Sequence, residues 1–277
     1  MKNDNVIYPQ PFVKWVGGKR QIIDKIKNKI PSNFNDYYEP FVGGGAVLFN
    51  INSENIFIND INEQLINVYH QIKNNYKELA YQIDCLNSEE VNSIRYEKLR
   101  ELYNDKIINK ELDLECAALF MIINKYCFNG VYRVNKKGLY NVPWNKKTKV
   151  KIYELDNLKA ISKKLQNATI KSGDFLNVLK TVKKRDFVFF DSPYAPLNET
   201  TFNSYTQTGF TKDDHKRLAQ EFKRLDGKGV YLMLTNHNTK LIRELYKEYH
   251  IELLDVKRAV NSDASNRVGK EIIITNY

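Results

Sequence analysis

Residues suited to catalysis stand out in the segment Asp191–Tyr194, Asp-Ser-Pro-Tyr, which directly follows the apolar run Phe187–Phe190. The run is short, aromatic and β-branched, so it predicts a central strand buried on both faces. In open α/β sheets, ligands bind just outside the carboxyl ends of the strands, so this strand would carry a carboxylate and a tyrosine into a site. Asp, Ser and Pro also favour turns, so a turn without catalytic function is the alternative for this segment taken alone.

A second candidate lies near the N-terminus, where Phe12–Lys19 joins two glycines to two lysines and a tryptophan ahead of a predicted helix, 20–30. Gly17 and Gly18 permit close approach of the backbone at a helix N-terminus, which suits an anion or carboxylate. Lys19 would add a charge-assisted contact. The spacing is not that of a Walker P-loop, and no Ser or Thr follows the lysine. A surface turn that caps the helix is the alternative.

A glycine turn and a strand-end acid indicate a nucleoside site. The stretch 37–49 has the pattern of a strand, a glycine turn (Gly43–Gly45) and an apolar helix, and a second strand, Asn55–Ile58, precedes Asp60. In dinucleotide-binding folds, an acid about 20 residues after the glycine turn binds the ribose hydroxyls. The glycines here are consecutive, not spaced as in pyrophosphate sites, so we expect a nucleoside cofactor without a phosphate.

The chain has 277 residues, enough for one α/β domain with a large insertion. Within residues 61–165, apolar residues recur at helical spacing and no segment fits a strand of the sheet. We therefore expect a catalytic domain made of residues 1–60 and 166–277, interrupted by a mostly helical inserted domain at 61–165.

Inside this insertion, the segment 124–144 is too rich in Asn, Gly and Lys for a core and too aromatic for a linker. Asn and Arg read adenine and guanine edges in the DNA major groove, and the lysines could hold phosphates. Phe128 or Tyr132 could wedge or stack against bases. Asn129-Gly130 and Lys137-Gly138 both have the sequence of hairpin turns, so a surface β-hairpin without a partner is the alternative.

The α/β pattern resumes after the insertion. A strand that begins at Thr169 ends in Asp174 and Phe175, which could contact and stack on an adenine ring. After the predicted central strand, the polar loop 195–210 is long enough to form a lid or a DNA-contacting loop.

The chain is basic, with 43 Lys and Arg against 33 Asp and Glu and a net charge of +10. A basic surface favours polyanions, of which nucleic acid is the commonest. The last two predicted strands, 251–258 and 271–276, indicate an antiparallel hairpin on an otherwise parallel sheet. Arg267 and Lys270, in the polar loop between them, would lie near a polyanion.

Other classes of protein find little support in the sequence. The three cysteines and four histidines are scattered without metal-ligand spacing, so we expect reduced thiols and no metal site. The N-terminus lacks the apolar segment of a secretory signal, and no apolar stretch approaches membrane-spanning length. We therefore expect a cytoplasmic, DNA-associated protein with no membrane partner.

Five motifs resemble those of the Dam family of DNA adenine-N6 methyltransferases, over nearly the whole chain. They correspond to the family's N-terminal cofactor motif, glycine motif, second-strand motif, target-recognition hairpin and catalytic Asp-Pro-Pro-Tyr. In that order they are Lys14–Lys19, Glu39–Gly45, Asn59–Asn62, Asn129–Asn135 with Asn141–Pro143, and Asp191–Tyr194. Each motif alone is common, but the five in this order are specific to the family.

The resemblance implies S-adenosylmethionine as methyl donor, double-stranded DNA as partner, and a Rossmann-like methyltransferase sheet whose helical insertion is a target-recognition domain carrying a β-hairpin. Together with Asp174 and Phe175, the cofactor-binding residues are then Trp15, Lys19, Glu39, Phe41, Gly43, Gly45, Asp60 and Asp191. The DNA-binding residues are Phe128, Asn129, Val131, Arg133, Asn135 and Pro143. The catalytic residues are Asp191, Ser192, Pro193 and Tyr194.

One position departs from the family pattern, because Ser192 stands where the family has proline. Adenine N6 is a poor nucleophile, since its lone pair is delocalised into the ring. We hypothesise that Asp191 and the carbonyl of residue 192 accept the two N6 hydrogens and aim the lone pair at the sulfonium methyl. Serine keeps that carbonyl and loses only the fixed φ of proline, so we expect activity to survive. Tyr194 would stack on the flipped adenine.

The predicted function is site-specific methylation of adenine N6 in duplex DNA, within GATC because the hairpin resembles that of GATC-modifying members. One alternative is a catalytically silent DNA-binding protein of the same fold, because of Ser192. Another is methylation of a different exocyclic amine or target sequence, since an acid-x-Pro-aromatic motif serves any such amine. A cognate restriction endonuclease in the same system is a partner that the sequence leaves open, with no direct contact implied.

Overall fold

The structure is a computed structural model that describes residues 8–197, 209–257 and 268–277. Most of the polar loop expected at 195–210 lies outside the described residues, as do Arg267 and the side chain of Lys270.

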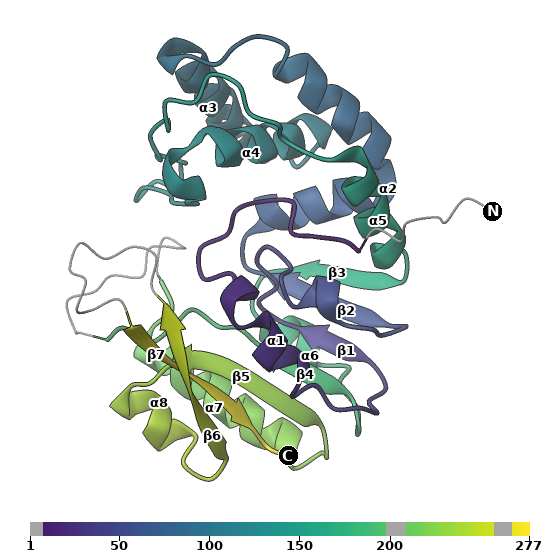
Figure 1. The fold of residues 1–277 in the computed structure, drawn as a ribbon, viewed down its shortest axis with the longest axis vertical. Helices are drawn as coiled ribbons and strands as arrows, with labels where there is room; N and C mark the ends of the chain where they lie inside the picture. Colours follow the sequence, from purple (N-terminus) through teal and green to yellow (C-terminus); the bar gives the residue numbers. More distant parts are fainter. Residues whose placement is uncertain (1–7, 198–208, 258–267) are drawn as a thin grey trace.

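Within the described ranges, a seven-stranded sheet has the order β3-β2-β1-β4-β5-β7-β6 (Figure 1). Neighbouring strands are parallel except at β7, which runs antiparallel to both β5 and β6. The strands are β1 (Tyr37–Glu39), β2 (Ile56–Asp60), β3 (Ala168–Ser172), β4 (Phe187–Phe190), β5 (Tyr231–His237), β6 (His250–Lys257) and β7 (Val268–Thr275). This confirms the Rossmann-like sheet with a terminal antiparallel hairpin.

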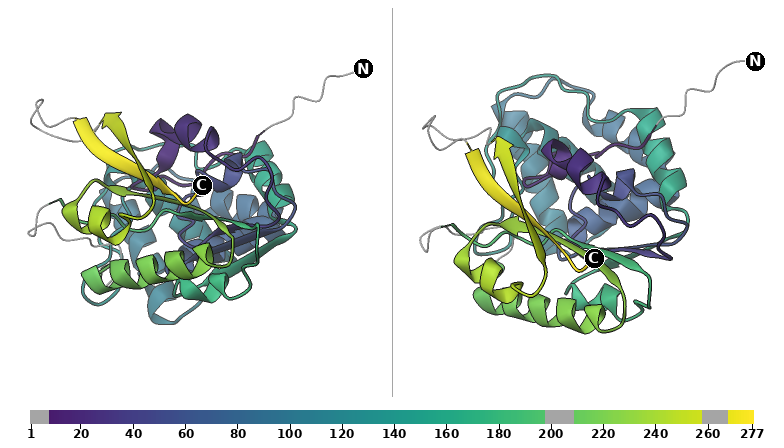
Figure 2. Two further views of the ribbon diagram at one scale, coloured as in Figure 1. Left: turned by 90° about the horizontal axis from the view of Figure 1, so that it is seen from below. Right: turned by 60° about the horizontal axis from the view of Figure 1, so that its bottom comes forward.

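Helices cover both faces of this sheet and form a separate stack beyond β3 (Figure 1). The α-helices are α1 (Ile23–Lys27), α2 (Glu63–Leu86), α3 (Ser93–Ile108), α4 (Leu114–Tyr126), α5 (Leu155–Leu165), α6 (Leu176–Leu179), α7 (Lys212–Asp226) and α8 (Lys240–Leu245). Short 3-10 turns are η1 (Lys19–Gln21), η2 (Leu48–Asn50) and η3 (Phe128–Gly130). Helices α1 and α7 lie on opposite faces of the sheet (Figure 2).

Strand β4 is buried on both faces, as its apolar run predicts. Phe187 and Phe189 pack into the core cluster that also holds α2 and α4, whereas Val188 and Phe190 pack into the cluster that holds α7. All four side chains are fully buried. The alternation follows from the two-residue period of a strand, and it fixes the direction in which the next residue, Asp191, leaves the sheet.

Helix α2 connects the sheet to the helical stack. It begins directly after β2, where the side chain of Asn62 caps it by accepting a hydrogen bond from the Leu65 N–H. It packs against β2 and β3 and also against α4 and α5, and it is interrupted by non-helical φ and ψ at Asn75. Helix α4 is buried nearly all round, which makes it the core of the stack.

Some predicted helices are shorter than expected. The helix predicted at 20–30 is a 3-10 turn followed by the brief α1, and neither has a side-chain N-cap. The apolar helix expected after the glycine turn is reduced to η2. Helix α8 ends at Leu245, so that the chain can turn into β6. None of the described helices is long and apolar enough to cross a membrane.

Gly45 is a glycine for reasons of packing. Its φ is +76°, and an added Cβ would lie 2.7 Å from both Phe49 Cε2 and the Tyr69 hydroxyl. We expect Gly45→Ala to lower the free energy of unfolding by about 2–4 kcal/mol, through backbone strain and overpacking together. Urea denaturation followed by circular dichroism measures this loss.

Gly17 offers a matched control. Its φ of +81° is similar, but nothing lies within 4 Å of an added Cβ. Gly17→Ala should therefore cost only the backbone strain, about 1 kcal/mol. Equal losses in the two variants would show that close packing at Gly45 contributes nothing.

Candidate active site

A cavity of about 990 Å³ opens at the carboxyl ends of the parallel strands. It gathers side chains from segments that are far apart in the sequence. The predicted residues that line it are Trp15, Lys19, Glu39, Phe41, Gly43, Asp60, Asn129, Asp174, Phe175, Asp191, Ser192, Pro193 and Tyr194. Gly45, Phe128, Val131, Arg133, Asn135 and Pro143 are not among its lining residues.

Asp60 lies at the end of β2 with its carboxylate fixed by backbone donors. Oδ2 accepts a hydrogen bond from the Gly43 N–H at 2.9 Å, and Oδ1 accepts one from the Asn62 N–H at 3.0 Å. Burial raises the pKa of Asp60, and these N–H groups oppose that shift. Each carboxylate oxygen can accept a further hydrogen bond, so the group is suited to a pair of vicinal hydroxyls.

Trp15 forms one wall of the cavity. Its indole stacks on Tyr132, with ring centroids 5.6 Å apart, and on Phe120 at 6.3 Å. An added Cβ at Gly43 would lie 2.8 Å from Trp15 Cδ1, so the glycine allows the turn to pack against this ring. The prediction that Tyr132 could wedge between bases is wrong, because its ring is buried in this stack.

An aromatic cluster also lines the cavity. The rings of Phe41 and Phe175 are 5.3 Å apart, and Phe210 meets Phe41 edge-on at 5.8 Å. Arg217 donates from Nη2 to Asp174 Oδ2 at 2.8 Å, and its guanidinium lies over the Phe175 ring. The sequence analysis did not single out Phe210 or Arg217, because the first lies in a polar loop and the second on an exposed helix face.

Asp191 and Lys19 form an ion pair inside the cavity. Lys19 Nζ lies 2.6 Å from Asp191 Oδ1, and the two side chains are 4% and 20% exposed. Lys19 also donates to the Gly17 carbonyl at 2.5 Å, and the Thr235 hydroxyl donates to the same Asp191 Oδ1 at 2.9 Å. Burial raises the pKa of Asp191, and the charge and hydrogen bond of Lys19 oppose the shift.

Tyr194 is held from several sides. Its hydroxyl donates to Glu271 Oε2 at 2.9 Å, and Lys19 Nζ lies 4.6 Å from the centre of its ring. His237 meets the ring edge-on at 4.8 Å. Burial raises the pKa of the phenol well above its usual value, and the charge of Asp191 adds to this effect. Tyr194 is therefore a neutral, oriented aromatic ring, which suits stacking rather than acid–base chemistry.

Glu39 is the most buried acid of the cavity lining, with 2% of its surface exposed. Tyr37 donates its hydroxyl hydrogen to Glu39 Oε2 at 2.8 Å. Burial raises the pKa of Glu39 well above the usual value, although the Tyr37 hydrogen bond opposes the shift.

The recognition segment, residues 124–144, differs in part from the predicted hairpin. It contains two isolated antiparallel bridges, Cys127 with Trp144 and Val134 with Tyr140, rather than a continuous ladder. The predicted turn at Asn129-Gly130 is η3, a tight turn directly after α4, whereas the turn at Lys137-Gly138 is present. The backbone N–H and carbonyl of Tyr140 bond to the Asn104 side chain, at 2.9 and 3.1 Å, instead of to a neighbouring strand.

Within this segment, Arg133 is exposed but oriented. Its Nε donates to the Asn141 side-chain oxygen at 2.9 Å, and its Nη2 donates to the Asn141 carbonyl at 3.2 Å. Asn135 accepts hydrogen bonds from the Lys137 and Leu139 N–H groups, so its amide oxygen stabilises the turn. Of the remaining predicted DNA contacts, Phe128, Asn129 and Pro143 are exposed and Val131 is half-buried.

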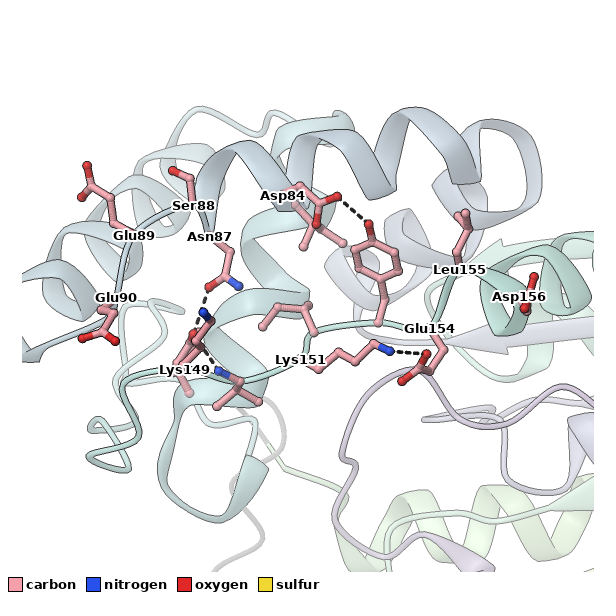
Figure 3. A pocket seen from close by; sticks show the side chains of 15 residues that line it. Asp84, Asn87, Ser88, Glu89, Glu90, Lys149, Lys151, Glu154, Leu155 and Asp156 are labelled. Atoms are coloured by element: carbon pink, nitrogen blue, oxygen red, sulfur yellow. Dashed lines mark hydrogen bonds and ion pairs between the residues drawn. The ribbon is translucent and has the colours of Figure 1, made fainter.

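A second cavity of about 710 Å³ lies between the end of α2 and the segment 149–156 (Figure 3). Its polar groups pair with one another: Tyr153 donates to Asp84 at 2.7 Å, and Lys151 pairs with Glu154 at 2.5 Å. Acids outnumber lysines in its lining, so it is a poor site for nucleic acid phosphates.

A Rossmann-like sheet with a strand-end acid at Asp60, an aromatic cluster and a strand-end Asp-Ser-Pro-Tyr segment is typical of transferases that act with a nucleoside cofactor. Comparison with known families makes this specific. A profile described as "D12 class N6 adenine-specific DNA methyltransferase" matches residues 15–260. The chain belongs to this family of enzymes, which use S-adenosylmethionine as methyl donor.

Relatives match almost end to end. The "Type II methyltransferase M1.LlaDCHI" of Lactococcus lactis is 43% identical over 99% of this chain and 97% of its own. The "Type II methyltransferase M.MjaIII" of Methanocaldococcus jannaschii is 40% identical over 97% of this chain and 99% of its own. The "DNA adenine methylase" of Escherichia coli K12 is 30% identical over 96% of this chain and 94% of its own.

A similarity among solved structures is more distant. Wild-type Trm5b of Pyrococcus abyssi aligns over 95% of this chain and 50% of its own, with 13% identity and a TM-score of 0.33. A TM-score this low does not establish a shared fold, so the fold is assigned from the strand order.

Several residues of the site were missed by the sequence analysis. Thr235, Asn236 and His237 end β5, and Glu271 pairs with His237 across the β5–β7 ladder. The polar ending of β5 after a buried run was the available signal, because the same pattern identified Asp191 at the end of β4. No comparable signal marks Glu271.

The ion pair between Lys19 and Asp191 leads to a prediction about the pH dependence of kcat/KM. An ionised carboxylate is the better hydrogen-bond acceptor, so if Asp191 accepts hydrogens from a substrate, activity should fall as pH falls through its pKa. Lys19 lowers that pKa, which burial has raised. We therefore expect Lys19→Gln to move the acid limb of the kcat/KM profile to higher pH, measured between about pH 5 and 9.

Lys19→Arg is the matched control, because it keeps the positive charge and should leave the acid limb near its wild-type position. A Lys19→Gln profile that is lower at every pH but unshifted would show that Lys19 does not control the ionisation of Asp191.

Proposed function

We propose that this chain methylates adenine N6 within GATC in double-stranded DNA, with a flipped adenine bound beside Asp191. The proposal rests on the hydrogen bonding of the Asp191 carboxylate. Lys19 and Thr235 both donate to Oδ1, and no donor to Oδ2 is found among the described residues. Oδ2 can therefore accept a hydrogen from the N6 amino group.

The chain's own residues then prepare the nucleophile. S-adenosylmethionine supplies an electrophilic methyl group on a sulfonium. Asp191 Oδ2 and the carbonyl of Ser192 accept the two N6 hydrogens, which localises the nitrogen lone pair and aims it at that methyl. Tyr194 stacks on the base, and its hydrogen bond to Glu271 holds the hydroxyl end of the ring in place.

The same proposal assigns the cofactor residues. Asp60 binds the ribose hydroxyls, while Asp174, Phe175 and Phe41 hold the adenine ring. The remaining residues, Trp15, Lys19, Glu39 and Gly43, complete the wall around the cofactor. Support comes from their shared place in one cavity. Gly45 would act through packing rather than contact.

We infer that residues 1–60 and 166–277 form the catalytic domain and that residues 61–165 form the target-recognition domain. Arg133 is the candidate for guanine, because Asn141 holds its guanidinium while leaving further N–H groups for the O6 and N7 atoms of the base. Phe128, Asn129, Val131, Asn135 and Pro143 would make the remaining contacts, with Asn135 using its amide nitrogen.

The names of two relatives support a proposal about the biological setting. Two of them are named Type II methyltransferases, which supports a role as the modification enzyme beside a cognate restriction endonuclease. On this proposal the substrate would be cellular DNA and the enzyme would be cytoplasmic.

Plasmid DNA from a methylation-deficient host that expresses this chain tests the proposal. One nuclease should be blocked by adenine methylation at GATC, and a second should require it. We expect protection from the first nuclease and cleavage by the second, which would also show that Ser192 supports catalysis. If neither pattern appears, sequencing of modified bases distinguishes another target sequence from an inactive protein.

Arg133 allows a sharper test of the target sequence. We expect Arg133→Ala to lower kcat/KM on GATC by the equivalent of about 1–3 kcal/mol and to relax the preference at one base pair, because a bidentate guanine contact is lost. Methylation rates on duplexes with single substitutions in GATC measure both effects.

Lys137→Ala is the control, since Lys137 is an exposed cation of the same segment. Lys137→Ala should weaken the binding of all duplexes alike and reduce the salt dependence of that binding. A uniform loss with Arg133→Ala as well would identify Arg133 as a phosphate contact and remove the support for GATC.

A further inference from the structure

The last three residues of β5 all contact the catalytic segment, here residues 191–195. Thr235 donates to Asp191 Oδ1 at 2.9 Å. Asn236 contacts residues 192 and 195, and His237 Nδ1 lies 2.9 Å from the Ala195 carbonyl. The shape of the catalytic segment is therefore set by the neighbouring strand as well as by its own sequence.

Asn236 is the central member of this group. Its side chain is fully buried. Its Oδ1 accepts hydrogen bonds from the Ala195 N–H at 2.8 Å and from the His237 N–H at 2.9 Å. Its Nδ2 donates to Ser192 Oγ at 3.4 Å, and no other acceptor for Nδ2 is found among the described residues.

Ser192 is also buried, with 1% of its surface exposed. A buried hydroxyl without a partner is costly, so the contact with Asn236 satisfies both side chains. Ser192 precedes Pro193, which already confines it to extended conformations. The freedom that remains is its φ, which a proline at this position would fix.

We propose that Asn236 is a positioning residue for methyl transfer, and that its amide holds the backbone at residue 192 in place of the proline ring. The inference rests on the proposed function of the catalytic segment. By bridging Ser192 and Ala195, the amide spans both sides of Pro193 and Tyr194. It thereby fixes the Ser192 carbonyl that accepts an N6 hydrogen and the ring on which the base stacks.

The consequence is a specific dependence between two positions. Misplacement of a reacting group by 1 Å can cost about 100-fold in rate. Loss of the Asn236 amide should therefore matter most when residue 192 is serine. It should matter less when proline fixes the same backbone by itself.

A double-mutant cycle tests this dependence. On a GATC duplex, Asn236→Ala should lower kcat about 10–100-fold, with KM for DNA and for S-adenosylmethionine changed less than about threefold. In the Ser192→Pro background, the same substitution should lower kcat by about threefold or less. Equal losses in both backgrounds would overturn the proposal.

Asn276→Ala is the matched control. Asn276 anchors the opposite end of β5, where it accepts from the Leu232 N–H at 2.8 Å and donates to Asp226 and the Val230 carbonyl. It should lower the melting temperature without lowering kcat. A fall in kcat equal to that of Asn236→Ala would show a general effect of weakening β5, and would count against the proposal.

Hydrogen exchange provides a readout that needs no turnover. The Ala195 N–H should exchange faster in Asn236→Ala than in wild type, and this acceleration should be smaller in the Ser192→Pro background. A wild-type chain that binds S-adenosylmethionine but methylates no DNA would contradict the proposed function alone. The exchange comparison would then still decide whether Asn236 holds the segment, and unchanged exchange at Ala195 would refute it.

Discussion

The site depends on the ion pair between Lys19 and Asp191, because it joins the N-terminal segment to the central strand inside the cavity. Burying each charge costs several kcal/mol, and only good geometry with further hydrogen bonds offsets that cost. Gly17 supplies one such bond to the ammonium and Thr235 one to the carboxylate. Removing one member of such a pair leaves the other charge buried and unpaired, which typically destabilises a protein by about 3–5 kcal/mol. The two side chains are therefore kept in contact.

Around this pair the cavity is acidic, although the chain has a net charge of +10. The charge of Glu271 raises the pKa of Asp191, and the charge of Asp191 raises the pKa of Glu39, so these acids repel one another. S-adenosylmethionine carries a sulfonium, an ammonium and one carboxylate, so its net positive charge would relieve this repulsion.

The sequence was sufficient to predict the parts of this site that follow from the direction of strands. Asp60 ends a parallel strand, Asp174 and Asp191 follow soon after one, and all three line the cavity. Glu271 was not predictable in this way, because β7 runs antiparallel and its residue reaches the same edge through its register with His237. Such a contact depends on long-range pairing that no local pattern reveals.

Composition was a poorer guide than strand direction in the recognition segment. Its Asn, Gly and Lys content predicted exposed aromatic rings, and Phe128 is exposed as expected. Tyr132 is buried because Trp15, more than 100 residues earlier in the chain, provides a ring on which it stacks at 5.6 Å. Burial was decided by a partner that lies outside the segment.

The stack of Trp15 on Tyr132 connects the cavity wall to residues 124–144. Trp15 touches Tyr132 on one side and the glycine turn at Gly43 on the other. The side chain of Asn124 adds hydrogen bonds of 2.8 and 2.9 Å to the N–H and carbonyl of Lys14, so the recognition segment and the N-terminal segment are joined twice. Packed interiors transmit displacement, so under the proposed function DNA that displaced residues 124–144 would also displace the Trp15 wall of the cavity. Any such coupling is reciprocal, so a bound cofactor must favour the DNA-binding arrangement to the same extent.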